Sequence, residues 1–177
     1  FIWIGTTMGL LRWDGYSYNS ITQFNNIEIN EIYADPYNKE ILWLGSQKKI
    51  FQFNISTLTE VSFDITKKLN KNIVTTFLKD RMKNLWVGTN KGLLKFDNSM
   101  SNSQLFMPDS SNQNCISSKG INILFQDSDD NIWIGTDNGL DLYNYSGNNF
   151  SQYLEKSKYN KSTRGVTSIA QDSNGDL

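Results

Sequence analysis

The stretch from Asn84 to Asp97 reads NLWVGTNKGLLKFD. It predicts a short apolar strand, a tight turn in which Gly92 takes a positive φ, and a return strand. The same phrase recurs as IWIGTTMGLL from Ile2 and as IWIGTDNGLDLY from Ile132, and a weaker copy, LWLGSQKKIF, starts at Leu42. Four copies of one phrase in a single chain indicate a repeat protein.

The length of the repeat indicates the kind of repeat. Its tryptophans, Trp3, Trp43, Trp86 and Trp133, are 40, 43 and 47 residues apart, and an apolar run ending in Asp precedes each of the last three. A period near 40–50 residues with several short strands is typical of a β-propeller blade. We therefore expect an all-β fold made of four repeats of a four-stranded antiparallel sheet. They form one segment of a larger, seven-bladed-type propeller, with blade periods at about 1–40, 41–83, 84–130 and 131–177.

The strands of each blade follow from the repeat. The inner strand is expected at 30–34, 74–79, 121–126 and 166–171, and the outer strand near 16–21, 60–63, 104–107 and 150–154. Gly5, Gly45, Gly88 and Gly135 share one register, where a side chain would obstruct the packing of neighbouring blades. Two departures stand out: Lys49 replaces the turn glycine, so that this turn must differ, and an insert at 108–120 lengthens the last spacing.

Composition excludes several classes of function. The net charge of −1 gives no bulk attraction to nucleic acid, and no apolar run is long enough to cross a bilayer. Histidine is absent, which removes the commonest general base and the commonest zinc ligand. The runs DSDDN at 127–131 and DSNGD at 172–176 are similar to calcium loops, but every copy has a polar turn there. We interpret both as turns and expect no metal, no cofactor and no catalytic activity in this segment.

The phrase Leu/Ile-Trp-Ile/Val-Gly-Thr with a Gly-Leu after the turn, preceded by a strand ending in Asp, resembles the two-component-regulator propeller repeat. The resemblance covers essentially the whole chain and is weakest in the second copy. It implies the periplasmic sensor region of a membrane-anchored hybrid two-component histidine kinase of the Bacteroidetes type, with further blades and receptor domains as neighbours. It also implies a signal in the form of glycan-derived oligosaccharides.

One set of residues goes beyond that resemblance. In a propeller the turn after each Trp strand and the connection between blades lie at one rim. By this rule 11 of the 17 basic residues fall on that rim, whereas most turn aspartates fall on the opposite rim. A basic rim would attract an anionic oligosaccharide or an acidic partner; ordinary solvated loops are the alternative interpretation. The expected ligand-binding residues of this basic rim are Lys48, Lys49, Lys67, Lys68, Lys71, Lys91, Lys119, Lys158, Tyr159 and Arg164. The four repeat tryptophans are expected in the core, and loop aromatics that could stack on a sugar are Tyr37, Phe106 and Tyr159.

Three functions remain open at this stage. The first is a ligand-recognition segment of a sensor, and the second is a structural or dimerisation module of a receptor that binds its ligand elsewhere. The third is a carbohydrate-active propeller enzyme. Because the sequence starts just before one Trp and stops where another is expected, we expect it to be a piece of a longer chain. On its own, it is expected to close by pairing 166–171 beside residues 1–6 or to associate with a second copy, as in a homodimer.

Overall fold

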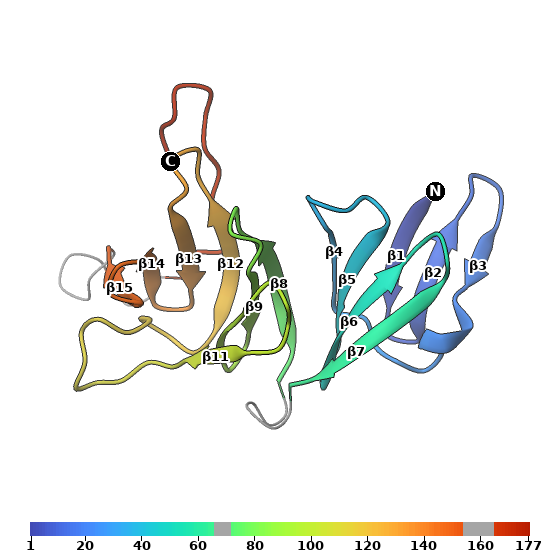
Figure 1. Cartoon of the computed structure of the whole chain (residues 1–177), viewed down its shortest axis with the longest axis horizontal. Coiled ribbons are helices and arrows are strands. Elements are labelled where there is room, and N and C mark those ends of the chain that lie inside the picture. Colours follow the sequence, from blue (N-terminus) through green and yellow to red (C-terminus); the bar gives the residue numbers. More distant parts are fainter. Residues whose placement is uncertain (66–71, 154–164) are drawn as a thin grey trace. The chain divides into compact units, whose positions relative to one another are not determined.

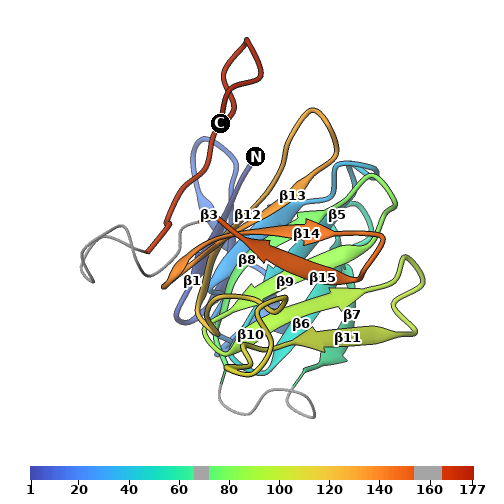
Figure 2. The same cartoon turned by 90° about the vertical axis from the view of Figure 1, so that its left-hand side faces the viewer.

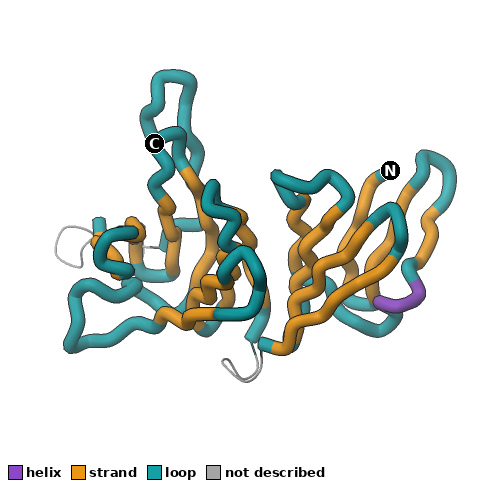
Figure 3. Tube along the Cα trace, viewed as in Figure 1, coloured by secondary structure: helices purple, strands orange, loops and turns teal. Residues whose placement is uncertain are grey.

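A computed structural model describes residues 1–65, 72–153 and 165–177 of the chain. The described residues form an all-β fold in which the single helical element is the 3-10 turn η1 (Thr22–Phe24), drawn in purple in Figure 3. The described part contains no helix long and apolar enough to span a membrane. The chain divides into two compact units, Phe1–Val74 and Thr75–Leu177, and each is described by itself.

The first unit holds two antiparallel sheets (Figure 1). One has the order β1 (Ile2–Thr6), β2 (Gly9–Trp13), β3 (Tyr18–Ser20); the other has β4 (Glu31–Ala34), β5 (Ile41–Gly45), β6 (Lys49–Asn54), β7 (Thr59–Asp64). A buried cluster joins them, with Phe24 meeting Phe51 and Phe53 edge-on at ring-centroid distances of 5.2 Å. Edge-on rings at this distance are a favourable arrangement of aromatic quadrupoles.

The second unit repeats the arrangement with two complete sheets. The first contains β8 (Val74–Lys79), β9 (Leu85–Thr89), β10 (Gly92–Phe96) and β11 (Ser103–Phe106). The second contains β12 (Ile121–Gln126), β13 (Ile132–Thr136), β14 (Gly139–Asn144) and β15 (Asn149–Gln152), seen from a second side in Figure 2. Every sheet is a meander with neighbouring strands paired antiparallel, which confirms the predicted fold class.

The repeated glycine permits one sheet to approach the next. A Cβ on Gly88 in β9 would lie 2.5 Å from Cγ2 of Thr76 and 2.7 Å from Cγ2 of Ile121, the first residue of β12. Gly5 in β1 is similarly close to Ile29. No side chain fits at such distances without displacing its neighbours, so the packing role expected of these two glycines agrees with the structure.

Two expectations about strands need correction. Residues 166–171 form no strand, and none of the described strands pairs with them. The sheet of β1, β2 and β3 has three described strands, one fewer than the four expected of each blade. The complete sheets begin at their inner strands, Glu31, Val74 and Ile121, whereas the predicted periods begin near the Trp strand. The exact blade periods therefore stay a prediction.

The turn without glycine has a different geometry, as expected. In the other copies the turn residues Gly9, Gly92 and Gly139 have φ values of 141°, 148° and 148°. Lys49, at the same position, lies outside the positive-φ region, and its turn is a bend instead of a regular turn. Ser46 still stabilises it by donating a hydrogen bond to the Lys49 carbonyl at 2.9 Å, as Thr89 does to that of Gly92 at 2.8 Å.

Candidate functional site

A hydrogen bond from the repeat tryptophan to the preceding aspartate recurs in the structure. The indole Nε1 donates to a carboxylate Oδ2 in the pairs Trp43–Asp35, Trp86–Asp80 and Trp133–Asp127, at 2.9, 2.9 and 2.8 Å. In each pair the other oxygen, Oδ1, accepts backbone N–H groups of the turn, including that of Asn84 at 2.8 Å. One carboxylate thus closes the turn and satisfies a buried indole.

This arrangement explains the calcium-like runs. In the run at 127–131, Oδ1 of Asp127 accepts the N–H of Asp129 and of Asn131, while Oδ2 is bound by the Asn131 amide and the indole. Burial raises the pKa of Asp127, but the hydrogen bonds from Trp133 and Asn131 outweigh it and hold the pKa below its ordinary value. The carboxylate at 172 binds the N–H groups of Asn174 and Asp176 in the same way. These oxygens are engaged in turns.

Aspartates in the outer turns have the same role. Asp14 accepts the backbone N–H of Ser17 and Tyr16, which lower its pKa to about 2. The pKa of Asp97 is lowered first by the amide of Asn102 and then by the Ser99 hydroxyl. Turn chemistry therefore accounts for these two aspartates as well.

The basic rim is only partly within the described residues. Lys48 and Lys49 lie at the β5–β6 turn of the first unit, and both are exposed. In the second unit Lys91 lies in the β9–β10 turn and Lys119 lies just before β12. Gly88 near the end of β9 is in contact with Ile121 at the start of β12, so the two lysines lie at the same end of their sheets. The remaining residues of the predicted site lie outside the described residues: Lys67, Lys68, Lys71, Lys158, Tyr159 and Arg164.

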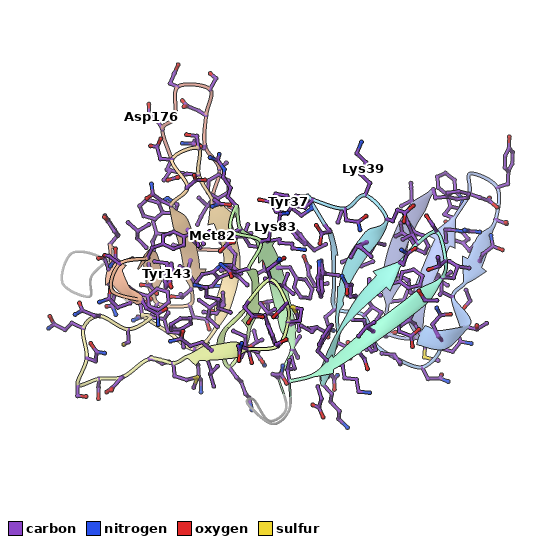
Figure 4. The ribbon with its side chains drawn as sticks, in the orientation of Figure 1. Tyr37, Lys39, Met82, Lys83, Tyr143 and Asp176 are labelled. Atoms are coloured by element: carbon purple, nitrogen blue, oxygen red, sulfur yellow. The ribbon has the colours of Figure 1, made fainter. Side chains whose placement is uncertain are left out.

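Lys39 lies at the opposite end of the first unit's four-stranded sheet. It belongs to the β4–β5 turn, and its side chain projects away from the protein (Figure 4). The two ends of this sheet thus each carry exposed lysines, which makes them directly comparable.

The aromatic expectations have mixed outcomes. Trp43 and Trp86 are buried, at 1% and 0% exposure, as expected of core residues, while Trp3 and Trp133 are half-buried. Phe106 was wrong as a sugar-stacking candidate, because it is the last residue of β11 and packs edge-on against Phe150 at 5.0 Å. Tyr37 is 45% exposed in the β4–β5 turn, on the rim opposite the basic one.

A cluster around Lys95 was not anticipated. Its ammonium lies 5.0 Å from the ring centroid of Trp86, 4.9 Å from that of Tyr143 (labelled in Figure 4) and 5.9 Å from that of Tyr145. It also donates to the Tyr143 hydroxyl at 3.1 Å, and that hydroxyl donates to Asn148 at 2.7 Å. Burial raises the pKa of Tyr145, and the charge of Asp80 raises it further. The rings hold the cation between the two sheets by cation–π attraction.

The sequence gives no direct signal for this cluster. Lys95 sits in an otherwise apolar return strand, and Tyr143 and Tyr145 follow 48 and 50 positions later, in and just after the corresponding strand of the next repeat. A lysine in one return strand with tyrosines one repeat later is the pattern that would have indicated it.

Comparisons with known proteins show what two of the repeats are similar to. Residues 68–91 and 115–138 match the family model described as two component regulator propeller. No curated protein matches the chain. Among solved structures, the extracellular domain of the hybrid two component system BT4673 from B. thetaiotaomicron superposes with a TM-score of 0.68 at 24% identity over 86% of this chain. That of BT3049 from the same organism gives 0.68 at 20% identity over 84%.

The likeness to these structures shows the fold. The chain spans 20% of the BT4673 domain and 21% of the BT3049 domain, so it corresponds to a part of each. An ancestral GH74 enzyme also superposes, with a TM-score of 0.62 at 18% identity over 85% of this chain and 23% of its own. The same architecture is therefore found in proteins of different function.

Proposed function

Because the chain carries two component regulator propeller repeats, we propose that it is a non-catalytic recognition segment in the sensor region of a two-component system. The observation that carries the proposal is the agreement between the family match and the two propeller-type extracellular domains it superposes on. By analogy with those domains, we place it outside the cytoplasmic membrane, in the periplasm of a bacterium related to Bacteroides. Its neighbours there would be further blades and other domains of the receptor.

The proposed ligand is an oligosaccharide released from a complex glycan, bound at the basic rim. The support is chemical. Several carboxylates of the opposite rim accept backbone N–H groups of turns, namely those of Asp14, Asp35, Asp80, Asp97, Asp127 and Asp172. At the β5–β6 turn of the first unit, by contrast, Lys48 and Lys49 are exposed. Exposed ammonium groups attract carboxylate or sulfate groups over about 8 Å at physiological salt. An anionic sugar, such as one rich in uronic acids, fits such a surface best.

Catalysis is the less favoured alternative. A glycosidase needs two carboxyl groups on either side of the scissile bond, with one held protonated. The regularly repeated carboxylates at positions 35, 80 and 127 each bind an indole and turn N–H groups. They are therefore not available as a catalytic pair.

Calorimetric titration tests the proposal. The chain is titrated with an oligogalacturonate and with a neutral galacto-oligosaccharide of the same length, at low and high salt. We expect binding of the anionic sugar that weakens several-fold as salt rises from about 0.02 M to about 0.3 M. Replacing Lys48→Gln and Lys49→Gln, singly and together, should weaken it further.

Lys39→Gln is the matched control, because it removes the same charge from the other end of the same sheet. Equal weakening by Lys39→Gln and by the Lys48 and Lys49 variants would contradict the basic rim as the site. If neither sugar gives a binding signal, the second candidate is favoured: a structural or dimerisation module in a receptor that binds its ligand elsewhere.

A further inference from the structure

Asp141 is a buried carboxylate at a position that is apolar in the other repeats. It pairs with Ile134 in β13, and the residues in the same register of the other sheets are Leu11, Phe51 and Leu94. Asp141 is 0% exposed, and its Oδ1 atom has no hydrogen-bond partner among the residues that the structure describes. A buried carboxylate oxygen without a partner destabilises a fold, so its presence here calls for a local reason.

The insert at 108–120 supplies that reason. Oδ2 of Asp141 accepts the backbone N–H of Ser117 at 2.8 Å and its hydroxyl at 3.0 Å. The Ser117 hydroxyl also shares a hydrogen bond with that of Thr136 at 2.7 Å, and the Asn138 amide donates to the Ser117 carbonyl at 3.2 Å. Beside it, Ile116 is completely buried. Asp141 therefore fastens the insert to the fourth sheet.

Among the described residues, the groups that face Asp141 are neutral. Thr136 lies on β13, and Gln152 is its partner on β15, where it donates to the Cys115 carbonyl at 2.9 Å. The nearest charged residues along these segments, Asp137 in the β13–β14 turn and Lys119 in the insert, are exposed. No cation in the described part of the chain compensates the buried charge. Burial accordingly raises the pKa of Asp141 to about 6, and the hydrogen bonds from Ser117 only partly offset the rise.

We propose that Asp141 is a protonation-sensitive latch that holds the insert closed in its protonated form and loosens it when the proton is lost. The ionised carboxylate needs a partner for Oδ1, and water reaches that atom when the insert lifts away. A pKa raised in the closed state means that closure is fully favoured below the ordinary aspartate value and is lost as the pH rises through about 6. The loop between the third and fourth sheets would therefore be ordered in mild acid and more open at neutral pH.

Amide hydrogen exchange over the insert tests this proposal. Protection factors, corrected for the intrinsic pH dependence of exchange, are compared at about pH 5 and about pH 7.5 for the wild type, Asp141→Leu and Asp141→Asn. A shift of about two pKa units corresponds to up to about a 100-fold change in the opening equilibrium. The full change spans the range from below the ordinary aspartate pKa to above about 6, so the interval from about pH 5 to about pH 7.5 covers about 10-fold of it. We expect protection of residues 108–120 to fall by about 10-fold over that interval in the wild type and to stay level in both variants.

The β9–β10 turn at 89–92 of the same unit lacks a buried carboxylate and is the internal reference; its protection should not change with pH in any of the proteins. Asp141→Leu restores the residue type of the other repeats, and Asp141→Asn carries the test if the leucine variant does not fold. The same pH dependence in the wild type and the asparagine variant would overturn the proposal. So would an Asp141 carboxyl carbon that titrates at the ordinary aspartate value in an NMR experiment.

Discussion

The hydrogen bond between Asp80 and Trp86 allows the sharpest test of how the blade is held together. Asp80 is 0% exposed and accepts three hydrogen bonds: from the Asn84 backbone, from the Asn84 amide and from the indole. Asp80→Ala removes all three. It leaves the indole N–H of Trp86, a residue that is itself fully buried, without an acceptor.

The magnitude follows from those orphaned donors. Each buried donor left unsatisfied costs about 1–3 kcal/mol. The indole donor of Trp86 is buried, and the two donors of Asn84 are partly buried. We expect Asp80→Ala to lower the free energy of unfolding by about 3–5 kcal/mol. Asp80→Asn keeps the shape of the side chain but turns an NH₂ group toward either the indole or the Asn84 N–H. We therefore expect it to recover less than half of the loss.

Urea unfolding followed by tryptophan fluorescence measures the effect. The same substitution in a Trp86→Phe background should cost about half as much, because the orphaned indole N–H is gone. Asp97→Ala is the control, since Asp97 closes an outer turn without binding an indole, and its loss should be much smaller. A cost of less than about 1 kcal/mol for Asp80→Ala, or the same cost in the Trp86→Phe background, would refute the reasoning.

Three other substitutions test separate features. Gly88→Ala should lower the free energy of unfolding in urea by about 1–3 kcal/mol, because the added Cβ meets two side chains within 3 Å. Gly165→Ala is the control: its added Cβ has no neighbour closer than 3.7 Å, so its stability should be within about 0.5 kcal/mol of the wild type. Lys95→Met should cost about 1–2 kcal/mol through loss of the cation–π contacts, and an unchanged stability would show that the ammonium contributes nothing there. Burial raises the pKa of Glu31, so the contribution of this carboxyl group to stability is full below the ordinary glutamate pKa and is lost as the pH rises. Glu31→Gln should therefore be more stable than the wild type at neutral pH but not at about pH 4. A gain in stability that is equal at both pH values would contradict the assignment.

The fold was predictable because the same sequence pattern occurs four times in the chain. The Trp strand, the return strand and the register of Gly88 can be read from one copy and checked against the others. Residues 166–171 match the inner strands in sequence, but a strand forms only when a partner lies beside it. The pattern of a single segment carries no information on whether that partner is present.

The site was less predictable, because its features depend on contacts between residues far apart in sequence. Asp141 is held by Ser117, which lies 24 positions earlier in an insert that no other repeat contains. The cluster around Lys95 includes Tyr143, which belongs to the next repeat in the sequence. Phe106 was expected as an aromatic that could stack on a sugar, yet it ends the outer strand β11, which was itself expected near 104–107, and its ring is buried. Departures from the repeat thus mark where sequence reasoning needs three-dimensional information.

The hydrogen bond between aspartate and tryptophan also bears on how a repeat chain can gain further copies by duplication. The two residues are six positions apart in the pairs at 80 and 127 but eight apart in the pair at 35, and the indole reaches the carboxylate at the same distance. The turn between them can therefore change length without breaking the link, and each copy satisfies its own buried polar groups. A unit with these properties can be duplicated, and its turns can diverge afterwards, with little effect on the neighbouring copies.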